Sequence, residues 1–490
     1  MCAATQSVGC GRTVSRHGDA GQAERCAAVS AKKRASVQPL SGLDAAFVYL
    51  EAAGTPMHVG GLMLLDRPKV GRAGFTAHLR AHLAQRLPKA KALRRILQPA
   101  PFAMDHPHWV DATDFDLDQH LSTHHLPKPG SEAQLLAVVA RLHAKPLDRS
   151  RPLWELHVIE GLADGSVAVF ALLHHALLDG QGAVALARVL LDIAPGVPIP
   201  AHTAHPRPVP SVPRKASAYA RVSSALLGLP QSLRDAWSAA PQMIESLRDS
   251  VMLAPRTPFN VQVGPARRVA IGSVPFADVR RIAKHFAVST NDVVMALCGA
   301  ALRDYLLRRK ALPRTSLVAA MPISLRANGD SEANNQVSMA QCALRTEIAD
   351  PVERLQAIAQ STRRIKQQVG LLRGLIPTDF PGLAAPLWAS GLSRVWASGH
   401  LAEKLPALAN LVISNVPGSP VPLYLAGARM RASFPISIVT HGLALNITVQ
   451  SYAGQLDIGI VSDRDAVRNP AIVLHGIEHA VQVLLGKIDP

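Results

Sequence analysis

The stretch Ser166-Val-Ala-Val-Phe-Ala-Leu-Leu-His-His-Ala-Leu-Leu-Asp-Gly180 carries most of the information about the fold of this chain. Its residues 167–173 form a continuous apolar run of strand length, which is typical of a central strand buried on both faces. The run ends at His174-His175, and Asp179-Gly180 then provides a turn before residues 181–193, whose pattern predicts a helix. Open α/β sheets hold their ligands at such strand-to-helix junctions. We therefore predict an α/β fold with a functional site at this junction.

The two histidines are candidates for general base catalysis. An imidazole has an ordinary pKa of about 6.5, so a neutral ring can take a proton from a hydroxyl at cellular pH. Asp179 is near enough in sequence to hold the turn or to orient the pair. The alternative is a pair of structural histidines bonded to backbone carbonyls, which is our interpretation of His124-His125 in a predicted loop. The buried strand before His174 and the Asp-Gly turn after His175 favour catalysis.

Composition narrows the class of protein. The chain has 490 residues, of which 48% are hydrophobic and 4% aromatic, with a formal net charge of +17. This length favours about two or three domains, and the apolar share excludes a largely disordered chain. Few rings argue against a platform for single-stranded nucleic acid, and five cysteines are too few for a disulfide scaffold. The positive charge fits nucleic acid, an anionic membrane surface or a polyanionic small substrate, and composition alone does not separate these three partners.

Two composition breaks divide the chain. Residues 1–38 are rich in Ala, Ser, Gly, Arg and Lys without periodicity, so we predict a disordered basic extension. The prolines concentrated within 195–213 exclude a helix or a central strand there. We therefore predict an N-terminal domain over 39–194, a Pro-rich linker and helical segment over 195–255, and a C-terminal domain over 256–490. Short β-like runs alternate with helical patterns in both domains, as in α/β proteins.

No stretch has the composition of a membrane span. The uncharged runs 405–428 and 432–456 are long enough, but prolines and amides interrupt the first, and the second alternates as strands do. The N-terminus has no compact apolar segment behind basic residues, so we expect no secretory signal. We expect a protein that is soluble or that binds one membrane face.

A second candidate site begins the helix predicted over 293–307, where Ser289-Thr290 precede Asn291 and Asp292. An amide donor at a helix start can bind the oxyanion that forms when a thioester carbonyl is attacked. The alternative is plain helix capping, for which Asn and Asp are both preferred. Cys298 lies near the same helical face as a possible nucleophile, but we interpret it as a small buried core thiol.

The motif His174-His175-Ala-Leu-Leu-Asp179-Gly180 resembles the HHxxxDG signature of the CoA-dependent acyltransferase superfamily. Further blocks resemble the bacterial wax ester synthase/diacylglycerol acyltransferases within it and follow their order over about residues 39–490. These blocks are Pro39-Leu-Ser-Gly-Leu-Asp44-Ala-Ala-Phe-Val-Tyr-Leu-Glu51, Pro56-Met-His-Val-Gly-Gly61, Trp109 with Phe115-Asp-Leu-Asp118, Pro152-Leu-Trp154, Asn291-Asp292-Val-Val294, Pro322-Ile-Ser-Leu-Arg326 and Ser414-Asn-Val-Pro-Gly418. The ordered set is far more specific than the single motif.

The resemblance implies two chloramphenicol-acetyltransferase-like α/β domains with the active-site tunnel between them. Acyl-CoA would enter from one side and the acceptor alcohol from the other. The match assigns His175 as the catalytic base and His174 as its supporting neighbour. Asp179 completes the motif in a role usually described as structural, and Gly180 gives the turn room.

The same resemblance places four residues elsewhere in the site. Asn291 and Asp292 match the family's ND motif, and the place of Asn291 at the helix start makes it our candidate oxyanion donor, with Asp292 in support. Glu51 and Trp109 fall at positions that the family retains near the tunnel. No metal and no cofactor is implied, since acyl-CoA serves as co-substrate.

The implied activity is esterification of diacylglycerol to triacylglycerol, with long-chain alcohols and wax esters as a second acceptor and product. The expected partners are acyl-CoA, the acceptor lipid and a membrane or lipid-droplet surface, without nucleic acid. We expect a cytoplasmic protein associated peripherally with such a surface. Two alternatives stay open, namely another HHxxxDG acyltransferase or condensation enzyme, and a non-catalytic lipid-binding or lipid-droplet protein.

Overall fold

The structure is a computed structural model that describes residues 38–52, 54–67, 74–100, 106–177, 181–198, 252–324, 337–372 and 406–488. The predicted extension over 1–38 and the predicted linker and helical segment over 195–255 lie almost entirely outside these residues. Asp179 and Gly180 lie outside them as well.

The predicted histidine-bearing strand is β7 (Val167–His174), and all of its residues are buried. It lies between β2 (His58–Leu65) and β6 (Trp154–Glu160) and runs antiparallel to both. Continuous apolar runs are usually associated with parallel sheets. In β7 the side chains are apolar because both faces of the strand are buried, although both neighbouring strands are antiparallel.

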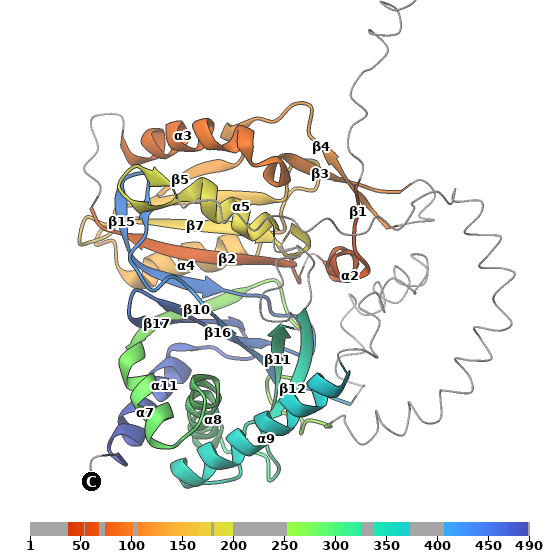
Figure 1. Cartoon of the computed structure of the whole chain (residues 1–490), viewed down its shortest axis with the longest axis vertical. Coiled ribbons are helices and arrows are strands. Elements are labelled where there is room, and N and C mark those ends of the chain that lie inside the picture. Colours follow the sequence, from red (N-terminus) through yellow and green to blue (C-terminus); the bar gives the residue numbers. More distant parts are fainter. Residues whose placement is uncertain are drawn as a thin grey trace, which may run out of the picture.

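β7 belongs to an eight-stranded sheet with the order β5-β6-β7-β2-β15-β14-β8-β9. The helices α3 (Gly74–Arg86), α4 (Glu132–His143) and α5 (Gln181–Leu190) belong to this part of the molecule, and α2 (Gly42–Leu50) lies beside the end of β7 (Figure 1). The remaining strands are β5 (Leu121–His125), β8 (Leu191–Ala194), β9 (Val197–Pro198), β14 (Tyr424–Leu425) and β15 (Ala428–Ile436).

A second sheet of six strands has the order β10-β17-β16-β13-β11-β12. The helices α7 (Phe276–His285), α8 (Thr290–Arg308), α9 (Pro351–Leu372) and α11 (Ala471–Leu485) gather on its far side from the first sheet (Figure 1). Its strands are β10 (Arg267–Pro275), β11 (Val318–Ser324), β12 (Val337–Ala343), β13 (Leu411–Val416), β16 (Leu445–Tyr452) and β17 (Gln455–Asp463). The two mixed sheets with their helices confirm the predicted α/β class.

A small third sheet flanks the first one and has the order β1-β4-β3. Its strands are β1 (Gln38–Pro39), β3 (Arg95–Gln98) and β4 (His108–Asp111). Short 3-10 turns connect nearby segments: η1 (Leu87–Lys89), η2 (Lys91–Arg94), η4 (Leu117–Gln119) and η5 (His175–Leu177).

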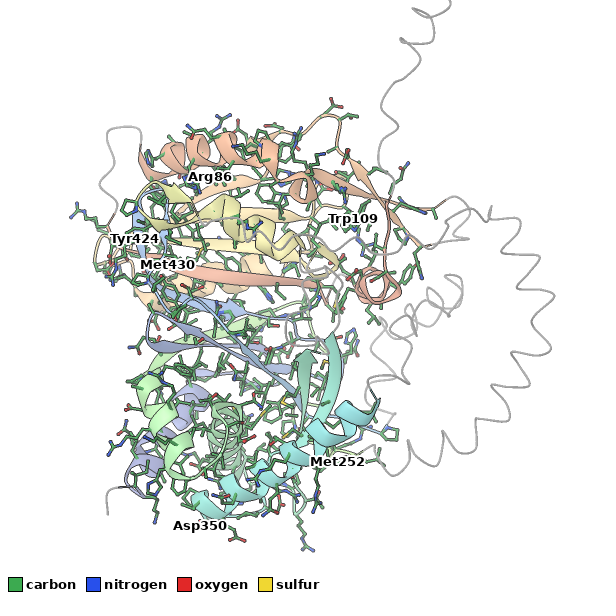
Figure 2. All side chains as sticks on the ribbon, in the orientation of Figure 1. Arg86, Trp109, Met252, Asp350, Tyr424 and Met430 are labelled. Atoms are coloured by element: carbon green, nitrogen blue, oxygen red, sulfur yellow. The ribbon has the colours of Figure 1, made fainter. Side chains whose placement is uncertain are left out.

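The first sheet is completed by strands from the other end of the chain. β14 and β15 come from the region predicted as the C-terminal domain, yet β15 pairs with β2 next to the histidine-bearing strand. Figure 2 shows Tyr424 of β14 and Met430 of β15 on one side of the N-terminal half, and both strands lie inside the sheet between β2 and β8. The two halves touch closely where β15 passes β17, since a Cβ at Gly459 would overlap the backbone carbonyl of Pro435.

The helix that carries Asn291 forms where the sequence predicts one, but it begins at Thr290, ahead of Asn291 and Asp292. Ser289 is the N-cap of α8 and accepts a hydrogen bond from the Asp292 backbone, while the Asp292 side chain accepts one from the Ser289 backbone. This reciprocal capping box satisfies N–H groups that a helix start leaves open. Most of α8 is buried, and α11 packs against it at Gly476, where a Cβ would lie 2.9 Å from the Cβ of Ala301.

Two local predictions are wrong. The helix predicted over 181–193 ends at Leu190, because residues from Leu191 pair with β14 as strand β8. His124-His125, predicted as a loop, ends strand β5, which pairs in parallel with β6. In both cases a partner distant in sequence overrides the local pattern.

Within the described residues, no single helix is both long and apolar enough to cross a membrane. The helices α7 and α8 together have the length and apolar composition of a membrane span, but the chain bends by 103° at the break between them.

Candidate active site

His175 lies directly after β7 and is held from two directions. Its backbone N–H donates to the carbonyl of Met57 at 2.8 Å, which ties the end of β7 to the start of β2. Its ring stacks on Phe47 of α2, with ring centroids 3.8 Å apart and an angle of 19° between the planes. The main chain and one face of the imidazole are therefore fixed, while the residue stays half-buried.

His174 faces Glu51, whose side chain is 5% exposed. His174 Nε2 and Glu51 Oε1 are 3.5 Å apart, which is an ion-pair distance rather than a short hydrogen bond. The same oxygen accepts a hydrogen bond from the backbone N–H of Met57 at 3.1 Å. Glu51 and Met57 thus bring one loop against both histidines.

The backbone determines where the proton of His174 sits. The Ala176 N–H donates to His174 Nδ1 at 3.1 Å, so Nδ1 is an acceptor there. A neutral imidazole with an accepting Nδ1 carries its proton on Nε2. We assign that proton from the hydrogen-bond network, and it points toward Glu51.

Arg149 holds the other oxygen of Glu51. Its Nε and Nη2 lie 3.0 and 2.7 Å from Glu51 Oε2, and Nη2 also donates to the carbonyl of Val48. Burial by itself would raise the pKa of Glu51. The polar contact with the Nε2–H of His174, followed by the Met57 backbone hydrogen bond and the charge of Arg149, outweighs burial and lowers that pKa from 4.5 to about 2. Glu51 is therefore a carboxylate at neutral pH.

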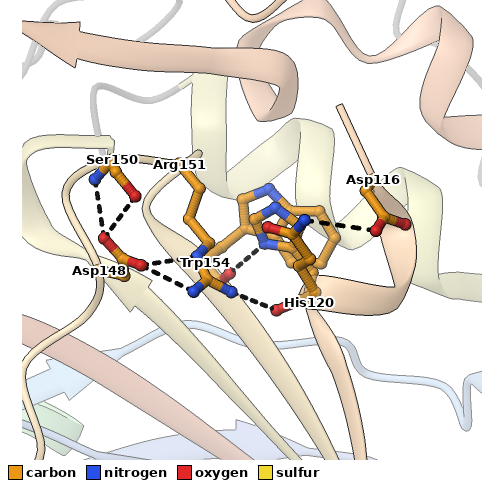
Figure 3. Close-up of polar contacts among 7 residues, drawn as sticks. Asp116, His120, Asp148, Ser150, Arg151 and Trp154 are labelled. Atoms are coloured by element: carbon orange, nitrogen blue, oxygen red, sulfur yellow. Dashed lines mark hydrogen bonds and ion pairs between the residues drawn. The ribbon is translucent and has the colours of Figure 1, made fainter. Parts of the chain in front are cut away.

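The turn that presents Arg149 is itself braced, as Figure 3 shows. Asp148 accepts hydrogen bonds from Ser150 and from both Nε and Nη2 of Arg151, whose Nη1 reaches the carbonyl of Gln119. The turn leads into Trp154, which is buried and whose carbonyl accepts from His120 Nδ1 at 2.7 Å. These contacts anchor both sides of the Arg149 backbone.

Burial lowers the pKa of His175 from 6.5 to about 4, and the neighbouring His174 imidazole acts in the same direction. The residue's own backbone carbonyl opposes this effect weakly. An ion in a poorly solvated site is disfavoured, so the ring is neutral at pH 7. A neutral imidazole is the form that can accept a proton.

Two further histidines lie behind the pair. His58 is opposite His174 in the β2–β7 ladder, and its Nε2 donates to the carbonyl of His143 at 2.9 Å. Burial lowers the pKa of His58 to about 4 and holds that of His143 well below its ordinary value. Both rings are therefore neutral packing partners. Among the described residues no group of three or more His, Cys, Asp or Glu could hold a metal ion.

Asn291 and Asp292 have different surroundings in α8. Asp292 is buried and accepts a hydrogen bond from Thr362 of α9 at 2.6 Å, in addition to its capping role. Asn291 is half-buried, with its Nδ2 3.5 Å from the sulfur of Met321 and its Oδ1 3.4 Å from Asn415 Nδ2. These are long contacts, so the Asn291 amide keeps donor capacity.

The remaining sequence candidates lie in other surroundings. Trp109 is a buried core residue of β4, in the outer part of the N-terminal half (Figure 2). Cys298 is buried in α8, and burial raises the pKa of its thiol to about 12, as expected of a core thiol. Asp179 and Gly180 are not among the described residues.

Sequence reasoning missed Phe47, Met57 and Arg149 as parts of this site. Phe47 and Met57 stand inside blocks quoted for the resemblance, but nothing local says that one stacks on His175 and the other bonds to it. Arg149 lies just before the Pro152-Leu-Trp154 block, and its contact with Glu51 joins segments far apart in the chain.

Comparison with known protein families gives two matches. The model described as wax ester synthase/diacylglycerol acyltransferase catalytic domain matches residues 40–294. The model of the C-terminal domain of the same family matches residues 333–484.

Relatives and solved structures agree with these matches. Two Mycobacterium tuberculosis proteins that carry the name diacylglycerol O-acyltransferase are 37% and 36% identical, over 91% and 90% of this chain and 99% and 97% of their own lengths. The structure of the Marinobacter aquaeolei wax ester synthase/diacylglycerol acyltransferase is 30% identical, with a TM-score of 0.67, covering 92% of this chain and 100% of that one. A starter condensation domain of rhizomide synthetase, solved in complex with C8-CoA and Leu-SNAC, shares the fold at 14% identity and a TM-score of 0.51, covering 93% of this chain and 95% of that chain.

Proposed function

Because the chain belongs to the wax ester synthase/diacylglycerol acyltransferase family, we propose that it transfers the acyl group of acyl-CoA to the free hydroxyl of diacylglycerol. Acyl transfer is the activity of this family, and the names of the mycobacterial relatives support diacylglycerol as the acceptor. The Marinobacter relative supports a long-chain alcohol as a second acceptor.

The observation that carries the proposal is the neutral, immobilised imidazole of His175. Its backbone is tied to Met57 and its ring is stacked on Phe47, so orientation is fixed before substrate arrives. Proton transfer by a positioned side chain contributes roughly 10²–10⁴-fold to rate. A low pKa leaves the ring unprotonated and ready across the physiological pH range.

The proposed reaction proceeds in two balanced steps. His175 takes the hydroxyl proton while the hydroxyl oxygen bonds to the thioester carbon, which gives a tetrahedral oxyanion and an imidazolium. The carbon–sulfur bond then breaks, the ester forms, and the imidazolium returns the proton to the leaving thiolate. We assign Asn291 as a donor to the oxyanion, since its amide makes only long contacts among the described residues.

We assign supporting roles to His174 and Glu51. The Nε2 proton of His174 faces the Glu51 carboxylate, which keeps this ring in one tautomer and orientation. Asp292 fixes the start of α8 and thereby the place of Asn291. We also propose that the protein works at a membrane or lipid-droplet surface, because its acceptors are apolar lipids.

One assay tests this function against its alternatives. Purified protein is incubated with radiolabelled palmitoyl-CoA and either diacylglycerol or hexadecanol, and lipid products are separated. We expect labelled triacylglycerol, and His175→Ala should lose nearly all of it while its circular dichroism stays that of the parent. No ester with either acceptor would favour a condensation enzyme or a non-catalytic lipid-binding protein. Substantial activity in the folded variant would refute the role of His175.

A further inference from the structure

We propose that an arginine-lined groove, outside the histidine site, binds the phosphate-bearing nucleotide end of acyl-CoA. This inference rests on the proposed function, because it names where the donor's charged end is held. The groove lies between α4, the first residues of β10 and the turn that leads from β17 into α11. We call it the arginine groove and define it by Arg141, Arg267, Arg268, Arg464 and Arg468.

The size and charge of the groove fit a nucleotide with several phosphates. Its volume is about 860 Å³, within the range of small-molecule sites. Five arginines line it against one acidic residue, Glu132. Guanidinium groups bind phosphate oxygens in a bidentate manner and stay charged at every physiological pH. Such a concentration of one charge around a hollow favours a polyanionic ligand.

Three of these arginines are exposed and have no carboxylate partner among the described residues, so their charge can act on a ligand. These are Arg141, Arg268 and Arg468. Arg464 lies 3.6 Å from Asp465, in an exposed pair that costs little to separate. By contrast, Arg80 elsewhere on the surface donates hydrogen bonds from Nε and Nη2 to the two carboxylate oxygens of Asp118.

Small residues between the arginines leave room for a flat ring. α4 and its C-cap line the groove with Ala133, Ala137, Ala140 and Ala144, and Leu136 is the one larger apolar side chain among them. Opposite it are Pro265, Ala266 and the Pro470-Ala471 start of α11. Their surfaces are apolar and short, so they suit a nucleobase and do not compete with the arginines for phosphate oxygens.

Arg267 links the groove to the loop that holds the histidines. Its guanidinium donates to the carbonyls of Gly264 and Gly54, and the side chain is almost completely buried. Gly54 stands between Glu51 and Met57, the residues that contact His174 and His175. Three residues of chain span at most about 11 Å. The groove therefore ends within reach of the loop that positions the proposed base.

Arg267 also has one side-chain nitrogen that makes no hydrogen bond within the described residues. This atom is the Nε, which is buried. A buried donor without a partner is costly, and a phosphate oxygen in the groove would satisfy it only after the Arg267 side chain shifts toward the ligand.

The experiment compares two donors that differ only in the nucleotide. Palmitoyl-CoA carries the phosphates, and palmitoyl-pantetheine carries the same thioester without them. The test variant is Arg268→Glu/Arg468→Glu. The matched control is Arg363→Glu/Arg364→Glu, which makes the same charge change at two exposed positions of α9. We expect the ratio of KM for palmitoyl-CoA to KM for palmitoyl-pantetheine to rise at least tenfold in the test variant and less than twofold in the control.

Binding measured without turnover separates this inference from the proposed function. Titration calorimetry with free CoA should show at least tenfold weaker binding to the test variant than to the parent or the control. That result would stand even if neither diacylglycerol nor hexadecanol were acylated. Unchanged CoA binding and an unchanged KM ratio would overturn the inference. Unchanged CoA binding together with reduced binding to phosphatidylglycerol vesicles would assign the groove to a lipid surface instead.

Discussion

Glu51 reaches His174 across the sequence, with its Oε1 3.5 Å from the imidazole Nε2 and its Oε2 held by Arg149. A single buried carboxylate thus connects α2, the turn before β6 and the end of β7. Its ionised form is the one that the fold favours, because the pKa of Glu51 falls from 4.5 to about 2 on folding.

Glu51→Gln should destabilise the protein in a pH-dependent way. The unfolded state binds the proton more readily, so the carboxylate's contribution is complete above pH 4.5 and disappears as the pH falls toward 2. The shift corresponds to a contribution on the order of 3 kcal/mol at neutral pH. The free energy of unfolding, measured with urea, should therefore be higher for the parent than for the variant at pH 7. This difference should become smaller below pH 4.5. The exposed Glu353→Gln serves as control, and a difference of constant size would contradict the argument.

The activity should persist to unusually low pH for a histidine base. The acid limb of kcat/KM reports the pKa of the base in the free enzyme. Since burial and His174 lower the pKa of His175 to about 4, kcat/KM should be level from pH 7.5 to about 5 and fall with a midpoint near 4. Circular dichroism at each pH identifies any loss caused by unfolding. A midpoint above pH 6 in folded protein would refute the assignment.

Phe47→Ala should slow turnover without disturbing substrate binding. Removing the stacked ring frees His175 to rotate, and a displacement of about 1 Å can cost roughly 10²-fold in rate. We expect kcat to fall by about that factor with little change in KM, and Phe47→Tyr to retain most activity. If alanine and tyrosine variants turn over at the parent's rate, the ring does not position the base.

The two core thiols should be inert. Burial raises the pKa of both Cys298 and Cys342 to about 12, so neither forms an appreciable amount of thiolate at pH 8. Iodoacetamide should leave both unmodified in native protein, as judged by mass spectrometry of peptides, and Cys298→Ala should remain active. An acyl adduct on Cys298 during turnover would show instead that the reaction uses a covalent intermediate.

Gly459→Ala tests the junction of the two halves. The added methyl would overlap the Pro435 carbonyl, and overpacking of this kind costs about 1–3 kcal/mol or more. We expect a lower urea midpoint and reduced activity, since β15 also flanks β2. Gly61→Ala provides the control, because a Cβ there has nothing within 4 Å. Equal stability of the two variants would contradict the close approach.

Local features of this fold follow from sequence, because their causes are local. The apolar run of β7 and the capping residues Ser289 and Asp292 each specify their element within a few neighbours. The end of α5 at Leu190 does not follow, because pairing with Tyr424-Leu425 converts the next residues into a strand. Helical periodicity cannot reveal a strand partner that lies so far along the chain.

The candidate site divides in the same way. His174 and His175 are recognisable because strand, histidines and turn are contiguous. The contacts that fix them are not contiguous, since Phe47, Met57 and Arg149 meet them only in three dimensions. The resemblance pointed to Glu51 without its partners, and the position it gives Trp109 near the tunnel stays a prediction, since the structure shows only that this ring is buried in β4.

The placement of β15 beside β2 has a consequence for how the protein is made. A ribosome releases β2 and β7 long before it has synthesised β15, so one edge of β2 stays unpaired during most of translation. Exposed strand edges invite pairing with other chains. The first half therefore cannot reach its final state on its own, and a nascent chain stopped near residue 200 would need a chaperone, or the missing half supplied in trans, to escape aggregation.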